Sequence, residues 1–209
     1  PISTLIGVDQ KYVTAVETAL GVGLQHIVVD DENTAKACIR KLSENKAGRA
    51  TFYPISSVSA QNPTQEMLNA KKYKGYVGVA NELIKFDSRF DKIFSSLLGR
   101  TVVFDNIDNA TLMAKEQRYR IRVVTLDGQQ INVGGSFTGG SVKHDNTMLS
   151  RSADIKRMQA EMDETSKARD HTPSSPPSGM RQPTGHGSYI DFFLFEVVQR
   201  VLSDVDVPV

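Results

Sequence analysis

The sequence predicts an α/β fold of the α+β type, with mixed sheets and two small pseudo-symmetric lobes. Three observations support this: a repeated helix–strand–helix pattern, a strong hairpin signal, and a composition typical of a folded domain. Of the 209 residues, 39% are hydrophobic and 23% are charged, which allows a sizeable core. The net charge of +1 demands neither nucleic acid nor a membrane surface as a partner.

The repeat lies in segments 19–39 and 97–114. Each begins with a helix that ends at Leu-Gly, continues as a short apolar strand followed by Asp, and then enters another helix. Gly21 and Gly99 are predicted to end the first helix of each copy in the left-handed conformation. The residues suited to cap the second helix are Asp31 or Asn33 in one copy, and Asn106 or Asp108 in the other.

The helix that follows the first strand is predicted to bury one face. Its inward stripe consists of Ala35, Cys38, Ile39 and Leu42. Cys38 is the only cysteine, so the chain can form neither an intrachain disulfide nor a cysteine-based zinc site. No secretory signal and no run of eighteen apolar residues is found, so the sequence predicts a cytoplasmic protein without a membrane partner.

Composition divides the chain into a folded domain and a tail. Residues 1–150 are predicted to fold, whereas the later part contains a Pro-, Ser- and Gly-rich stretch without a core-forming period. The predicted regions are an N-terminal lobe over about 1–60, a C-terminal lobe over about 76–150, the start of a helix at 151–168, a disordered linker at 169–188, and a final segment at 189–209. For the final segment, a short helix and a non-native tail remain open.

Two clusters of basic residues are candidates for weak, nonspecific contact with DNA phosphates. In one, arginines alternate with apolar residues, which predicts a strand with one basic face. In the other, lysines surround a tyrosine. The candidate residues are Arg118, Arg120 and Arg122 in the strand, and Lys71, Lys72 and Lys74 in the earlier loop. The alternative is that both clusters are ordinary solvated surface.

Four glycines follow the hairpin signal at Asp127-Gly128, in the stretch GGSFTGGS. A phosphate-binding loop would place a lysine where Gly140 stands. The other interpretations are a flexible loop, or an edge strand that another backbone approaches closely, with Phe137 as an apolar anchor. The candidate contact residues are Gly134, Gly135, Ser136, Phe137, Thr138, Gly139 and Gly140.

Three stretches together resemble the hinge domain of bacterial SMC proteins, the coiled-coil ATPases that organise chromosomes. They read ALGVGLQHIVVDDENTAKACIRKLSENKAGRATFYPI, GRTVVFDNIDNATLMAK and RIRVVTLDGQQINVGGSFTGGS. The resemblance covers roughly residues 5–150. It implies a two-lobed α/β hinge at the tip of an antiparallel coiled coil, a ring-shaped homodimer with the glycine segment at the contact, and weak DNA binding.

The predicted function is therefore homodimerisation of a chromosome-organising SMC protein, for chromosome condensation and segregation in the nucleoid. The ATP-binding heads of the full-length family are absent from this chain, which carries no Walker A motif. Its four histidines are scattered, so no catalytic residue, metal site, cofactor or small-molecule substrate is predicted. The alternative is a small nucleotide- or phosphate-binding protein that uses the glycine-rich loop.

Overall fold

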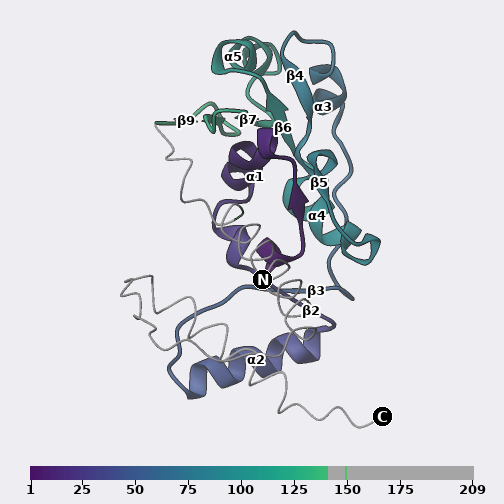
Figure 1. Cartoon of the computed structure of the whole chain (residues 1–209), viewed down its shortest axis with the longest axis vertical. Helices are drawn as coiled ribbons and strands as arrows, with labels where there is room; N and C mark the ends of the chain where they lie inside the picture. Colours follow the sequence, from purple (N-terminus) through teal and green to yellow (C-terminus); the bar gives the residue numbers. More distant parts are fainter. Residues whose placement is uncertain (141–148, 150–209) are drawn as a thin grey trace, which may run out of the picture.

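The computed structural model describes residues 1–140 and Leu149 and shows a mixed α/β fold (Figure 1). The strands are β1 (Gly7–Val8), β2 (Ile27–Val29), β3 (Phe52–Pro54), β4 (Tyr76–Val79), β5 (Ile84–Lys85), β6 (Thr101–Phe104), β7 (Arg122–Thr125), β8 (Gln130–Ile131) and β9 (Phe137–Thr138). The α-helices are α1 (Val13–Leu20), α2 (Glu32–Glu44), α3 (Gln65–Ala70), α4 (Asp91–Leu98) and α5 (Ile107–Glu116). The predictions for 151–168, 169–188 and 189–209 lie outside the described residues.

The described strands form one large sheet and two small ones. The large sheet has the order β4-β6-β7-β8-β9, while β1 pairs with β5 and β2 pairs with β3. β6 and β7 are parallel, whereas β4, β8 and β9 join the large sheet through antiparallel pairs. The mixed sheets predicted from the sequence are confirmed.

The sequence repeat becomes two parallel βαβ units. In the first, α2 connects β2 to β3, and in the second, α5 connects β6 to β7. A parallel pair requires such a crossover, because the chain must return to the same end of the sheet. Figure 1 shows that the first unit lies at one end of the molecule and the second within the large sheet at the other.

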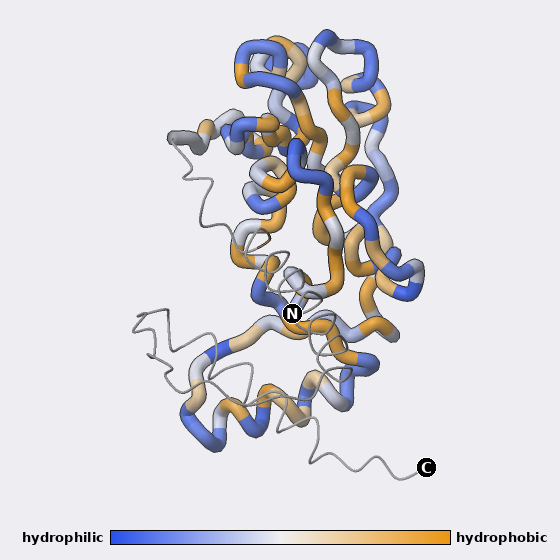
Figure 2. The backbone as a smooth tube through the Cα atoms, viewed as in Figure 1, coloured by the Kyte–Doolittle hydropathy of each residue, from blue (hydrophilic) through white to orange (hydrophobic). Residues whose placement is uncertain are grey.

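Two hydrophobic clusters cover the two faces of the large sheet. On one face, α1 and α4 pack against side chains that include Val103 and Val124. On the other, α3 and α5 pack against side chains that include Val102 and Val123. Neighbouring residues of a strand point to opposite faces, which explains this division. In Figure 2 the hydrophobic residues run along the inner strands, and hydrophilic residues gather at the outer turns.

The first cluster combines residues from both halves of the chain. Apolar side chains between Ile2 and Leu24 pack together with side chains between Ala80 and Val124. The pairing of β1 with β5 joins the same two parts through the backbone. The two predicted lobes therefore share the first hydrophobic cluster, and their exact limits stay a prediction.

The predicted helix caps are confirmed at two positions. The Asp31 side chain accepts a hydrogen bond of 2.7 Å from the Thr34 amide at the start of α2. The Asn106 side chain accepts one of 2.9 Å from the Asn109 amide at the start of α5. Each bond satisfies an amide that has no partner within its own helix.

The two glycines that follow a helix differ from each other. Gly21 has a positive φ of 52°, but its ψ of −127° lies outside the left-handed helical region, so the predicted conformation is not formed there. Gly99 has a φ of −64°, so the prediction of a left-handed residue there was wrong. Gly99 is instead needed for space, because a Cβ atom would lie 2.3 Å from the backbone oxygen of Ser95.

The predicted inward stripe of α2 is too wide by one residue. Ala35, Cys38 and Leu42 are buried, but 53% of Ile39 is exposed, so its assignment to the core was wrong. The sheet beneath α2 has only two strands, and it covers a narrow strip of the helix. Ile39 is turned about 100° around the helix axis from Cys38, beyond that strip.

Candidate functional site

The glycine segment forms the last hairpin of the large sheet. Thr125 and Gly128 close the preceding turn with a backbone bond of 2.9 Å, which confirms the predicted hairpin signal. The return strand β8 ends at Ile131. The chain then turns and comes back as β9, with Ile131 opposite Phe137. Among the described residues, no strand pairs with the outer side of β9.

The first two glycines build the turn between β8 and β9. Gly134 and Gly135 have φ angles of 89° and 92°, which side chains rarely tolerate. The Gly134 amide donates to the Tyr119 carbonyl at 2.9 Å, and the Gly135 amide donates to the Asn132 carbonyl at 3.0 Å. A Cβ atom on Gly135 would lie 3.3 Å from the Tyr119 ring. These two glycines therefore serve contacts within their own chain.

In the second pair of glycines, the Gln129 side chain binds Gly140. The Gly140 amide donates to Gln129 Oε1 at 3.1 Å, and Gln129 Nε2 donates to the Gly140 carbonyl at 3.1 Å. The side-chain amide thus pairs with the backbone as a neighbouring strand would. A Cβ atom on Gly139 would lie 1.9 Å from Gln129 Oε1, so a side chain at this position would displace the Gln129 amide from Gly140.

The edge beside these glycines is apolar and exposed. The exposed fraction is 53% for Phe137 in β9 and 64% for Val133 in the turn. The Asn132 amide donates to the Ser136 carbonyl at 2.8 Å, which makes these residues a hydrogen-bonded pair. Because such pairs alternate along antiparallel strands, the backbone N–H and C=O of Phe137 point away from β8. The edge therefore presents both an apolar side chain and backbone hydrogen-bonding groups.

A phosphate site in this segment is disfavoured by its hydrogen bonds. A phosphate loop uses backbone amides that point together at the anion. The amides of Gly134, Gly135 and Gly140 already donate to Tyr119, Asn132 and Gln129 respectively. The glycine spacing therefore serves a turn and a strand edge.

The predicted basic strand face is not formed. β7 begins at Arg122, and Arg118 lies in a turn with a positive φ of 54°, so the prediction of one continuous strand was wrong. Backbone oxygens bind the Arg122 guanidinium at the end of α1, and burial lowers its pKa. Arg118 and Arg120 are exposed. The alternation in sequence reflects a turn that leads into a short strand.

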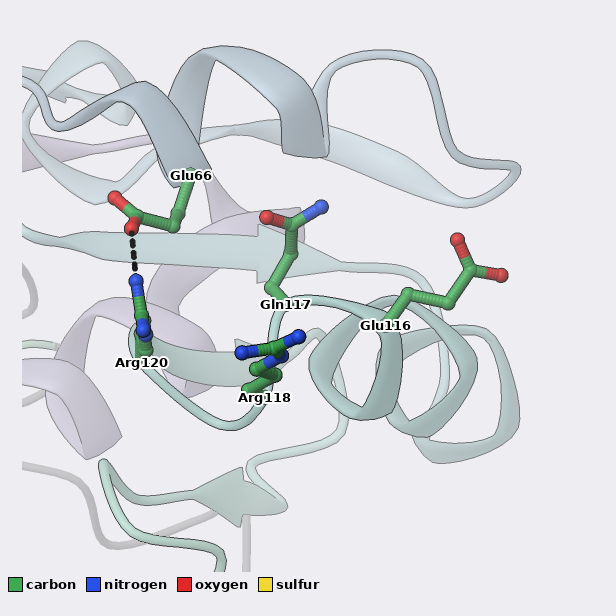
Figure 3. Close-up of a pocket in the computed structure, with 5 residues that line it drawn as sticks. All are labelled: Glu66, Glu116, Gln117, Arg118 and Arg120. Carbon is green, nitrogen blue, oxygen red and sulfur yellow. Dashed lines mark hydrogen bonds and ion pairs between the residues drawn. The ribbon is translucent and has the colours of Figure 1, made fainter.

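Arg118 and Arg120 line a shallow surface pocket of about 150 Å³ together with acidic residues (Figure 3). Glu66 comes from α3, while Glu116 and Gln117 come from the end of α5. The Arg120 guanidinium lies 3.5 Å from the Glu66 carboxylate. With two carboxylates beside two guanidinium groups, the pocket lacks the excess positive charge that a phosphate backbone would favour.

The lysine cluster lies beside this pocket. Lys71, Lys72 and Lys74 are exposed in the turn after α3. Within the same turn, the Tyr73 hydroxyl donates to Glu116 at 2.6 Å, so it is held by the pocket rather than free to stack on a base. The structure thus brings together two basic clusters that are far apart in the sequence.

Sequence reasoning did not identify Tyr119, Gln129 or Asn132. Tyr119 and Gln129 support the glycine hairpin through residues more than ten positions away, and Asn132 supports it from within the hairpin. No pattern of residue types in the sequence marks these contacts. Among residues 1–140 and Leu149, no helix is long and apolar enough to cross a bilayer, and no three acidic, histidine or cysteine side chains are grouped for a metal.

The fold and the glycine-bordered edge define a mixed α/β module that presents an open strand. The chain belongs to the SMC hinge domain family, since the model described as "SMC proteins Flexible Hinge Domain" matches residues 1–114. The chromosome partition protein Smc of Bacillus subtilis is 41% identical over 165 residues, which cover 77% of this chain and 14% of that protein. The corresponding protein of Desulfitobacterium hafniense is 39% identical over 164 residues. The chain thus spans 14% of the length of these relatives.

Solved hinge structures share the fold. An asymmetric dimer of the Geobacillus stearothermophilus SMC hinge domain matches with a TM-score of 0.70 and 31% identity, over 99% of this chain and 74% of that one. The hinge domain of the Pyrococcus furiosus SMC protein matches with a TM-score of 0.56 and 28% identity, over 71% of this chain and 78% of that one. The hinge fold and family predicted from the sequence are confirmed.

Proposed function

We propose that this chain is the homodimerisation module of a chromosome-organising SMC protein of the nucleoid. Two copies join two coiled-coil arms, and the whole protein acts in chromosome condensation and segregation. The dimer contact is formed by β9 and its flanking glycines. The function is mechanical, since the module holds two arms together while catalysis belongs to other parts of such proteins.

The open edge at β9 is the observation that carries this proposal. A strand edge with outward backbone groups favours pairing with another chain, and proteins usually cover or charge such edges. Here the edge carries the exposed Phe137 and is bordered by Gly139 and Gly140, which offer no side chain against an approaching backbone. The Geobacillus stearothermophilus relative, which shares this fold, was crystallised as a dimer.

Sedimentation of a Phe137→Ser variant tests the proposal. Burying the exposed half of a phenylalanine is worth on the order of 2 kcal/mol. The loss occurs in both copies, so the dimer Kd is expected to rise roughly a thousandfold. Ile39→Ser is the matched control, because Ile39 has the same exposed fraction of 53% and belongs to α2, a helix that lies far from β9 in Figure 1. Equal dimer masses for both variants and the wild type would contradict the proposed contact.

Sedimentation of the wild type, together with its heat stability with and without nucleotide, distinguishes the dimer from the nucleotide-binding alternative. A chain that remains monomeric at micromolar concentration, and that a nucleotide stabilises against heat, would support the alternative and overturn the dimer. We expect no stabilisation by nucleotide, since three glycine amides of the loop already have acceptors within the chain.

We also propose weak, nonspecific DNA contact through the lysine turn. Lys71, Lys72 and Lys74 are all exposed, and no ion pair is recorded for them among the described residues. Replacing the three lysines with glutamine is expected to weaken DNA binding and reduce the salt slope by about three units at most. Replacing Arg118 and Arg120 is expected to have less effect, because Glu66 and Glu116 lie beside them. An unchanged salt slope in the lysine variant would remove this part of the proposal.

A further inference from the structure

Arg122 binds the C-terminal end of α1. Its guanidinium donates to the carbonyl oxygens of Ala19 at 2.7 Å and Thr18 at 3.1 Å. The last carbonyls of a helix have no partner within the helix, and the helix end carries a partial negative charge. The guanidinium supplies both hydrogen bonds and opposite charge, and no ion pair between side chains is recorded for Arg122 within the described part of the chain.

The same guanidinium begins a chain of side-chain contacts that reaches β9. Arg122 donates to Gln130 Oε1 at 2.7 Å, and Gln130 Nε2 donates to Asn132 Oδ1. Asn132 Nδ2 then lies 3.1 Å from Ser136 Oγ and 3.4 Å from Thr138 Oγ1. Arg122, Gln130 and Asn132, with these two hydroxyls, form what we call the edge network.

The edge network acts on the face of β9 opposite Phe137. Neighbouring residues of a strand point to opposite faces, so Ser136 and Thr138 share one face and Phe137 lies on the other. Holding the two hydroxyl residues therefore sets the orientation of the phenyl ring at the open edge. The arginine fork suits this role, because it bonds to α1 and Gln130 at once.

α1 also contacts Leu149. Glu17 on α1 accepts a hydrogen bond of 2.6 Å from the Leu149 amide, and the Leu149 side chain is buried in the same cluster as α1. The helix thus contacts Leu149 through Glu17, and the edge network through Thr18 and Ala19.

We propose that Arg122 is a positioning residue that couples α1 to the edge strand β9 and so sets the strength of dimerisation. This inference rests on the proposed function, because it assumes that β9 is the dimer contact. It assigns to a half-buried arginine a role that neither DNA contact nor ordinary helix capping describes. It also makes the edge sensitive to how α1 packs.

Three variants of the complete chain test the coupling. Gln130→Leu breaks the edge network in its middle and leaves the Arg122 bonds to α1 intact. Arg122→Met removes both sets of bonds while keeping an unbranched apolar side chain. Arg120→Met is the matched control, since Arg120 is an exposed arginine outside the network. Each variant is examined by sedimentation for the dimer Kd and by chemical denaturation for stability.

We expect Gln130→Leu and Arg122→Met each to raise the dimer Kd roughly tenfold, as for the loss of one hydrogen bond to a charged group. Arg120→Met is expected to leave it unchanged. Only Arg122→Met is expected to lower the denaturation midpoint markedly, because it alone uncaps α1. If Gln130→Leu keeps the wild-type Kd while Arg122→Met merely unfolds more easily, Arg122 only stabilises the fold and the inference is wrong.

A second measurement does not depend on dimerisation. In the Phe137→Ser background, hydrogen exchange of the Asn132 amide reports how firmly β9 is held, because this amide donates to the Ser136 carbonyl. Gln130→Leu is expected to speed that exchange, and an unchanged rate would overturn the inference. If Phe137→Ser leaves the dimer intact, the proposed function fails instead, whatever the exchange rates show.

Discussion

Replacing Gly99 with alanine tests the close approach at the end of α4. The backbone at Gly99 has a φ of −64°, which alanine adopts without strain. In an open position the substitution would therefore stabilise the protein by about 0.4–1 kcal/mol through the unfolded chain. Here a Cβ atom would lie 2.3 Å from the Ser95 oxygen, a backbone atom that cannot rotate away.

Relieving that overlap would move Ser95 or the backbone after it. Overpacking of this kind typically costs about 1–3 kcal/mol. The shift would also disturb the Ser95 hydroxyl, which bonds to the Gln61 carbonyl at 3.0 Å and to the Gln61 amide at 3.2 Å, for a further loss of about 1 kcal/mol. After the gain from the unfolded chain is subtracted, the expected destabilisation is roughly 1–4 kcal/mol.

Gly23→Ala is the matched control for this prediction. A Cβ atom on Gly23 would lie 3.7 Å from the nearest atom, on His26, which is ordinary contact. Chemical denaturation should therefore show a clear loss of stability for Gly99→Ala, whereas Gly23→Ala should be neutral or slightly stabilising. Equal stabilities for Gly99→Ala and Gly23→Ala would refute the argument from close approach.

Three further predictions concern single side chains. Asn106→Ala should lower the free energy of unfolding by about 1 kcal/mol, because the Asn109 amide loses its acceptor. Asp108→Ala should lower it clearly less. Equal losses for the two variants in chemical denaturation would contradict the assigned cap. Burial lowers the pKa of His26, so the unfolded chain takes up a proton more readily as the pH falls below the ordinary histidine value of 6.5. Stability should accordingly be full above that pH and decline below it, and the decline should be shallower in His26→Leu; parallel pH profiles of the two proteins would exclude this contribution. Burial also raises the pKa of the Cys38 thiol, so alkylation by iodoacetamide should need prior unfolding, and rapid labelling of the native chain would contradict the packing.

Local patterns in the sequence predicted much of the fold. The strands β2 and β6 and the caps Asp31 and Asn106 follow from short-range rules about apolar runs and helix starts. The hairpin at Asp127-Gly128 follows from turn chemistry. These features depend on residues within a few positions of each other, which is why a single sequence contains enough information.

Features set by distant contacts could not be predicted in the same way. Glycine is needed at position 99 because a Cβ atom would overlap the Ser95 backbone, and not because of the backbone angles there. Ile39 is exposed because the two-stranded sheet beneath α2 is narrow. Arg122 reads as part of a basic strand, but its partners at Thr18 and Ala19 lie more than a hundred positions away. Only the folded chain brings such groups together.

The sequence predicted which residues form the candidate edge, but it did not predict the contacts that hold them. The stretch from Gly134 to Gly140 is the hairpin at the end of the large sheet, but its first two glycines serve the turn. The support from Tyr119 and Gln129 depends on tertiary contacts, so residue types and spacing alone did not reveal it.

The mixing of early and late residues in the first hydrophobic cluster affects how the protein could be divided. Because side chains between Ile2 and Leu24 pack with those between Ala80 and Val124, a protease cut in the segment 55–64 would not release two independent pieces. The fragments would remain associated through that cluster and through the pairing of β1 with β5. Separately expressed halves should for the same reason be unstable alone and should reassemble when mixed, so the protein is suited to a split reporter.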